Sequence, residues 1–107
     1  MSGITTHILD VSIGRPAPDV HVTLERKTDG VWEKLGDQRT DSDGRARELF
    51  RGPLATGVHR LTFAVGAYFE NSFYEDITIA FVVDDASQHY HVPLLLSPFG
   101  YSTYRGS

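Results

Sequence analysis

The sequence predicts an all-β protein, an antiparallel sandwich of two sheets with about eight strands and one short helix. Valine, isoleucine and threonine together number 23 and aromatic residues 12, whereas alanine numbers seven. β-Branched and aromatic residues favour the pleated sheet. Turn-forming residues recur every ten or so positions, and no segment shows sustained helical periodicity. Short strands at this spacing in 107 residues predict a single domain over residues 1–107.

Each expected strand is a run of apolar or β-branched residues bounded by turn-forming residues. In chain order the strands are residues 4–11, 19–26, 31–38, 46–50, 58–65, 76–83, 89–96 and 101–105. The turn signals between them are residues 14–18, 28–30, 41–44, 52–57 and 84–87. A short helix is expected near 66–71. Pro93 predicts an edge position or a ladder break in its strand, because proline has no backbone N–H.

The strand 89–96 carries apolar residues on both of its faces. Because side chains alternate along a strand, one face holds Tyr90, Val92, Leu94 and Leu96, and the other holds His89, His91, Pro93 and Leu95. A lone sandwich needs only one apolar face. Burial of the second face against another copy of the chain explains the pattern, so we expect a homo-oligomer.

Charge and composition exclude several classes of function. Ten basic and 14 acidic residues give a net charge of −4, which disfavours general nucleic-acid binding. There is no cysteine, so thiolate metal sites and cysteine nucleophiles are excluded. The longest apolar stretch is far shorter than a membrane span, and the N-terminus has no signal-peptide pattern, so we expect a cytoplasmic protein.

Candidate chemistry rests on histidines and one arginine. His89 and His91 project to the same side of a strand and resemble two-thirds of a three-histidine zinc site. Alternatively, one of these histidines is paired at the surface and the other is hydrogen-bonded within an interface. His7 lies mid-strand and is also consistent with a satisfied core histidine. Arg45 follows the turn 41–44, which either delivers its guanidinium to a pocket or leaves it in solvent.

Other catalytic motifs are absent from the sequence. The Gly-x-Ser-x-Gly elbow does not occur, so no serine triad is claimed. Phosphate-binding glycine loops do not occur either. The C-terminal strand ends in a cation, a glycine and Ser107, whose free carboxylate could tuck into a site, although C-termini fray by default.

Residues along the whole chain carry a resemblance to a known family. They are His7, Ile8, Leu9, Asp10, Gly14, Pro16 and Ala17; Thr40, Asp41, Asp43, Gly44 and Arg45; residues 89–98; and the terminal Tyr104, Arg105, Gly106 and Ser107. In this combination and order, the sequence resembles the 5-hydroxyisourate hydrolases, the enzymatic branch of the transthyretin-like family. The terminal tetrapeptide is that branch's signature, as against the hormone carriers.

The resemblance implies an eight-stranded sandwich that assembles as a homotetramer, a dimer of dimers, with active sites where the dimers meet. It implies a catalytic set of His7, Arg45, His91 and Ser107, supported by Tyr104 and Arg105, with no metal and no cofactor. His89 lies outside this set. The implied substrate is the small molecule 5-hydroxyisourate, whose six-membered ring is opened by water during urate breakdown.

Roles follow from what that reaction needs. A histidine has the pKa best matched to taking a proton from water near neutral pH, and this base is His7 or His91. Arg45 would stabilise the developing oxyanion or clamp the substrate. Two alternatives are a zinc hydrolase that uses His7, His89 and His91, and a small-molecule carrier that uses the same inter-subunit channel, since fold alone does not determine function.

Overall fold

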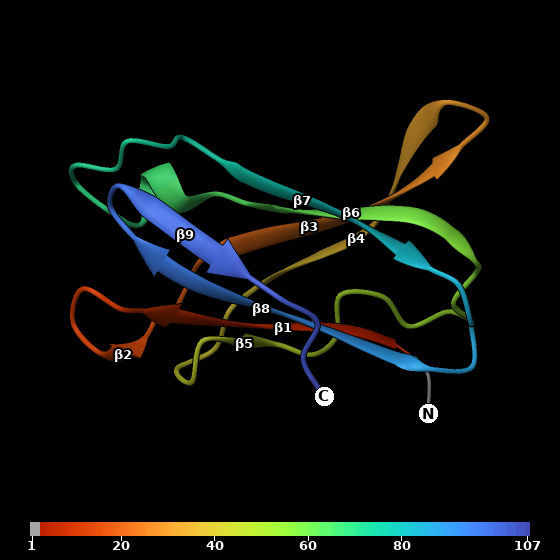
Figure 1. Cartoon of the computed structure of the whole chain (residues 1–107), viewed down its shortest axis with the longest axis horizontal. Coiled ribbons are helices and arrows are strands. Elements are labelled where there is room, and N and C mark those ends of the chain that lie inside the picture. The colour runs from red at the N-terminus through yellow and green to blue at the C-terminus, as the bar shows by residue number, and fades with distance from the viewer. Residues whose placement is uncertain (1–2) are drawn as a thin grey trace.

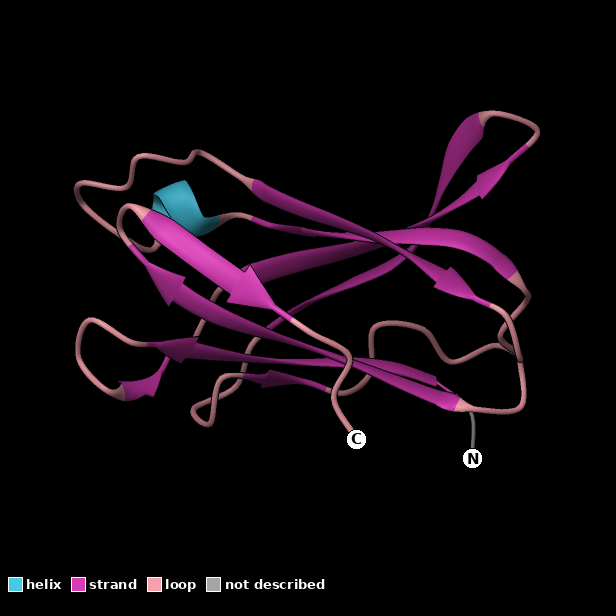
Figure 2. Ribbon diagram, in the orientation of Figure 1, coloured by secondary structure: helices cyan, strands magenta, loops and turns pink. Residues whose placement is uncertain are grey.

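The computed structural model describes residues 3–107 and contains two β-sheets packed face to face (Figures 1 and 2). Its elements, in order, are β1 (Gly3–Asp10), β2 (Arg15–Pro16), β3 (His21–Thr28), β4 (Val31–Arg39), β5 (Arg45–Ala46), β6 (Gly57–Phe63), the 3₁₀ helix η1 (Val65–Ala67), β7 (Ile77–Val83), β8 (His89–Ser97) and β9 (Gly100–Thr103). The predicted all-β sandwich is therefore confirmed. In the part of the chain described, no helix is long and apolar enough to cross a membrane.

The two sheets differ in how their strands pair. The second sheet has the order β4-β3-β6-β7, and all of its pairs are antiparallel. The first sheet has the order β2-β1-β8-β9, with β5 also paired to β1. Within it β1 and β8 run parallel, so the expectation of a purely antiparallel sandwich was wrong for this pair. Parallel neighbours in a sheet need a long connection between them. Between β1 and β8 the chain forms all the strands of the second sheet.

The core lies between the two sheets. Along β1 the burial alternates strictly, with every second side chain directed inward. The largest fully buried apolar side chains come from both sheets and include Ile8, Leu24, Leu61, Phe63, Leu94 and Leu96. Burying the inward face of β1 and β8 in this way leaves their alternate residues on the outer face of the first sheet.

Three expected elements differ from the structure. The strand expected at 46–50 is reduced to Arg45–Ala46, because the chain then turns away from β1 toward β4. There Glu48 N donates to the side chain of Gln38, and the Leu49 carbonyl passes so close to Gly36 that a Cβ on Gly36 would lie 1.9 Å from it. The helix expected at 66–71 is the single 3₁₀ turn Val65–Ala67.

Pro93 is the third difference. It does not lie on an edge strand, because β8 sits between β1 and β9. The β8–β9 ladder runs from Ser97 only to Leu94 and resumes as an isolated bridge at His91. Of the two alternatives predicted for Pro93, the ladder break is confirmed and the edge position is wrong. The Thr103 hydroxyl donates to the Pro93 carbonyl at 2.7 Å and holds the two strands together at the break.

His59 on β6 is a fully buried histidine of the core, with 0% of its surface exposed. Its Nδ1 lies 3.0 Å from the Gly57 carbonyl, whereas its Nε2 has no hydrogen-bond partner among the described residues. Burial lowers the pKa of His59 below its usual value, because desolvation disfavours the imidazolium. The folded state therefore holds this ring neutral.

This burial predicts a loss of stability in mild acid. The unfolded chain binds a proton on His59 at about pH 6.5, and the folded chain only at lower pH. The stability is therefore complete above pH 6.5 and falls as the pH drops toward the folded pKa, by up to about 1.4 kcal/mol per pH unit for one proton. His59→Phe removes the pH-dependent contribution of His59 to the free energy of unfolding. Urea unfolding at pH 7.5 and 5.5 should show a smaller loss in the variant, and equal losses would contradict the assignment.

Candidate active site

The outer face of β1 and β8 carries the polar groups that the sequence singled out. Parallel pairing places Thr5 opposite His91 and His7 opposite Pro93. Because side chains alternate, Thr5, His7, His89 and His91 all project from this one face. Residues that are more than 80 positions apart in the sequence are thus brought side by side by the register of one strand pair.

Arg45 joins the same face from β5, on the other side of β1. It is the partner of His7 in the β1–β5 pairing. The preceding turn places it there: the Asp41 side chain accepts hydrogen bonds from the backbone N–H groups of Asp43 and Arg45 at 2.9 and 3.0 Å. Both hydrogen bonds lower the pKa of Asp41 below its usual value, and the bond from Arg45 has the larger effect. The turn 41–44 predicted from sequence therefore delivers Arg45 to the sheet face.

Gly44 in this turn is required by its surroundings. Its φ is +72°, and a Cβ there would lie 2.5 Å from the Ile8 carbonyl. Ile8 N also donates to the Gly44 carbonyl at 2.8 Å. A side chain at this position would push the turn away from β1 and carry Arg45 with it.

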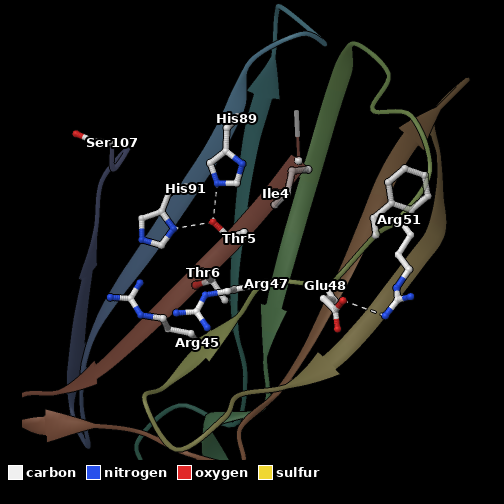
Figure 3. A pocket seen from close by; sticks show the side chains of 12 residues that line it. Ile4, Thr5, Thr6, Arg45, Arg47, Glu48, Arg51, His89, His91 and Ser107 are labelled. Atoms are coloured by element: carbon white, nitrogen blue, oxygen red, sulfur yellow. Dashed lines mark hydrogen bonds and ion pairs between the residues drawn. The ribbon is translucent and has the colours of Figure 1, made fainter. Parts of the chain in front are cut away.

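The C-terminal segment lies across β8 beside His91. Gly106 N donates to the His91 carbonyl at 2.8 Å, and a Cβ on Gly106 would lie 2.6 Å from Cδ2 of the His91 ring. Only glycine allows this approach, which brings Ser107 to the rim of the site (Figure 3). The sequence left open whether this segment enters a site or frays, and the bridge between His91 and Gly106 holds it against β8.

Tyr104 and Arg105, which precede Gly106, do not line the same cavity as Ser107. The Arg105 guanidinium packs over the Tyr90 ring, 4.5 Å from its centroid, and donates to the Gln88 side chain at 2.9 Å. The Tyr104 side chain is 59% exposed. Both residues line a second, smaller cavity of about 240 Å³. Arg105 is thus placed to anchor the tail, whereas Tyr104 does not face the main cavity.

The main cavity is an open groove of about 720 Å³ on the outer face. The side chains that matter for chemistry in its lining are Thr5, Arg45, Arg47, His89, His91 and Ser107. Arg45, His91 and Ser107 of the predicted set thus share one cavity. His7 lies on the same face between Arg45 and Pro93, but it is not one of the residues that line the cavity.

Within residues 3–107, hydrogen bonding engages one ring nitrogen of His91 and leaves the other without a partner. The Thr5 hydroxyl lies 2.8 Å from Nδ1 of His91 and 2.9 Å from Nε2 of His89, as the dashed lines in Figure 3 show. With Nδ1 engaged, Nε2 of His91 is the ring nitrogen available to a bound molecule. Thr5 was not predicted from sequence, since only the register of β1 and β8 reveals its position.

Arg45 and two further histidines lie near His91. Burial, the Arg45 guanidinium, and the nearby His89 and His7 all lower the pKa of His91. The ring is therefore neutral near pH 7 and able to accept a proton. Arg47 and Arg51 add positive charge to the groove, partly offset by their ion pairs with Asp41 and Glu48. The groove suits a polar molecule with carbonyl or anionic oxygens.

The geometry gives no support to the zinc alternative. Among residues 3–107, no three histidine, aspartate or glutamate side chains are arranged to hold a metal ion. The prediction that His89 and His91 share a face is correct, but the nitrogens that face each other are bridged by the Thr5 hydroxyl. His7 belongs to the neighbouring row of the sheet, opposite Pro93.

The fold and the site define a small two-sheet β-sandwich with a histidine–arginine groove on one outer face, closed at its rim by the C-terminus. Residues 4–106 match the model of the HIUase/Transthyretin family. The chain belongs to this family.

Individual relatives cover the full chain. The 5-hydroxyisourate hydrolase of Caulobacter vibrioides is 48% identical over the whole of both chains. The solved structure of Klebsiella pneumoniae 5-hydroxyisourate hydrolase is 40% identical, with a TM-score of 0.88 over all of both chains. Sea bream transthyretin, solved in complex with thyroxine, is 33% identical, with a TM-score of 0.90 over 96% of this chain and 93% of that one. The family thus includes proteins named as hydrolases and a protein that binds a hormone.

Proposed function

We propose that this protein is a 5-hydroxyisourate hydrolase of urate breakdown. It opens the six-membered ring of its substrate with water and yields 2-oxo-4-hydroxy-4-carboxy-5-ureidoimidazoline. The single observation that carries this proposal is the groove in which a neutral His91 lies with Arg45 and Ser107. Relatives of this chain that bear the hydrolase name, at 40–48% identity over nearly its full length, support the same activity.

His91 is the general base of the proposed reaction. Its free Nε2 takes a proton from the attacking water, and its neutral form is maintained by burial and by Arg45. Of the two candidates left open by the sequence, His91 lines the groove and His7 does not. His7 lies in the next row of the sheet and helps to orient Arg45, its partner across β1 and β5.

Arg45 stabilises the negative charge that develops on the substrate carbonyl as water adds. Among the described residues Arg45 has no carboxylate within ion-pair distance, so its guanidinium is available to a ligand. A fixed guanidinium donates paired hydrogen bonds to oxygen atoms, and loss of one such donor typically lowers turnover by about 10²–10³. Ser107 provides a hydroxyl at the rim, which positions the substrate.

The active protein is a cytoplasmic homotetramer, a dimer of dimers. β7 and β9 each form one edge of their sheet, and exposed apolar side chains lie on or beside them, including Val82, Phe99 and Tyr101. Exposed edges and apolar surface of this kind favour association with another copy. Assembly against the outer face of β8 would deepen the groove and exclude water from it.

The proposal predicts that the untagged protein accelerates the ultraviolet absorbance decay of 5-hydroxyisourate, generated in place from urate by urate oxidase. Arg45→Ala should lower kcat/KM by about 10²–10³, because the developing oxyanion loses its donor. Arg39→Ala is the matched control, since Arg39 pairs with Asp19 far from the groove, and it should retain the wild-type rate. Decay at the spontaneous rate with wild-type protein would contradict the proposal, and binding without turnover would favour a carrier.

A role for the free C-terminus predicts that extensions are not equivalent. A short peptide added after Ser107 would enter the groove that this residue lines. It should lower kcat/KM more than the same peptide added before Met1. Steady-state kinetics of the two extended proteins and the untagged chain measure the difference. Equal rates for both extensions would remove Ser107 from the proposed site.

A further inference from the structure

The Thr5 hydroxyl contacts two histidines of the groove at once. Its Oγ1 lies 2.8 Å from Nδ1 of His91 and 2.9 Å from Nε2 of His89, both normal hydrogen-bond distances. Strand register produces this arrangement, because Thr5 lies directly opposite His91, and Gly3 lies opposite His89. The three side chains form an unbroken chain from the half-buried His91 to the exposed His89.

A single hydroxyl proton couples the two imidazoles. A hydroxyl donates one hydrogen bond and accepts others, so Thr5 donates to one ring and accepts from the other. For Nε2 of His91 to be a base, its Nδ1 must carry the proton and donate it to Thr5. Thr5 then donates to Nε2 of His89, and the proton of His89 sits on Nδ1. The tautomers of His89 and His91 are therefore not independent.

We propose that Thr5 and His89 are positioning residues that form a proton relay for His91. As Nε2 of His91 takes a proton from water, the Nδ1 proton passes to Thr5 Oγ1, the hydroxyl proton passes to Nε2 of His89, and His89 releases its Nδ1 proton to solvent. When the ring nitrogen of the substrate departs, it takes the Nε2 proton of His91 and the relay runs back. Each ring then regains its starting tautomer, and the protons balance.

The charges around His91 favour moving a proton away from this ring. An imidazolium at His91 would face Arg45 from β5 and His7 from β1, and Arg47 lines the same groove, whereas the Glu48 carboxylate in that lining is paired with Arg51. Moving the positive charge to His89 places it in solvent, where its repulsion with these groups is weaker. Gly3 has no side chain opposite His89 and leaves Nδ1 of that ring accessible.

The inference rests on the proposed hydrolase activity and is tested by variants of the relay. Thr5→Val keeps the shape of the side chain and removes the hydroxyl, so kcat should fall at least tenfold with KM within about twofold, since proton transfer by a positioned group contributes 10²–10⁴. Thr5→Ser should recover most of the loss. Thr62→Val is the matched control, because that hydroxyl contacts Thr78 on the second sheet.

His89→Ala provides an independent readout. This exposed residue can be removed without opening the core, so folding is not at issue. Its kcat should fall at least tenfold and rise again with increasing imidazole, which replaces the missing proton acceptor. Adding His89→Ala to Thr5→Val should lower kcat no further, because both changes break the same chain. His21→Ala, which removes an exposed histidine that contacts Asp37, is the control and should match wild type.

Two results would overturn the relay. One is wild-type turnover by Thr5→Val or His89→Ala. The other is a loss in His89→Ala that imidazole does not restore. Both presuppose an active wild-type enzyme. An inactive wild type contradicts the proposed function itself, so the two failures are distinguishable.

Discussion

The parallel pairing of β1 with β8 is the constraint on which the rest of the site depends. Eight successive pairs, from Gly3 opposite His89 to Asp10 opposite Leu96, align the two strands. A shift by one residue would turn every side chain to the other face, and would put His91 into the core and Val92 into solvent. The buried apolar set of the two strands therefore enforces the register that places Thr5 against His91. The same hydrophobic burial that stabilises the fold thus positions the polar groups.

Two glycines allow the close approaches that bring the other groups of the site to the β1–β8 face. Gly44 lets the turn approach β1 so that Arg45 stands beside His7, and Gly106 lets the chain end approach the His91 ring. His91, Arg45 and Ser107 come from three distant parts of the chain and line one groove. Their proximity has an electrostatic consequence, because burial and Arg45 hold the pKa of His91 low and keep the ring neutral near pH 7.

Sequence patterns predicted much of the fold, because strand alternation and turn chemistry are local. The strand expected at 76–83 is observed as Ile77–Val83, and of the two positions left open for Arg45 after the turn 41–44, the structure shows the one in the groove. Long-range pairing is not encoded locally, so the parallel β1–β8 pair and the Thr5 bridge could not be foreseen. The two-residue β2 and the early end of β5 depend on tertiary contacts such as that between Gly36 and Leu49. The family resemblance, and not spacing, named His7, Arg45, His91 and Ser107 together.

The pH dependence of kcat/KM for 5-hydroxyisourate tests the central claim most directly, because this ratio reports the ionisation of the free enzyme. A neutral His91 with a lowered pKa predicts a rate that is constant near pH 7 and falls only below pH 6.5, as the imidazolium forms. The residual rate of His91→Asn should lack this acidic limb. A wild-type rate that rises as the pH falls below 6.5 would show that the protonated ring is the active form, and would contradict the account.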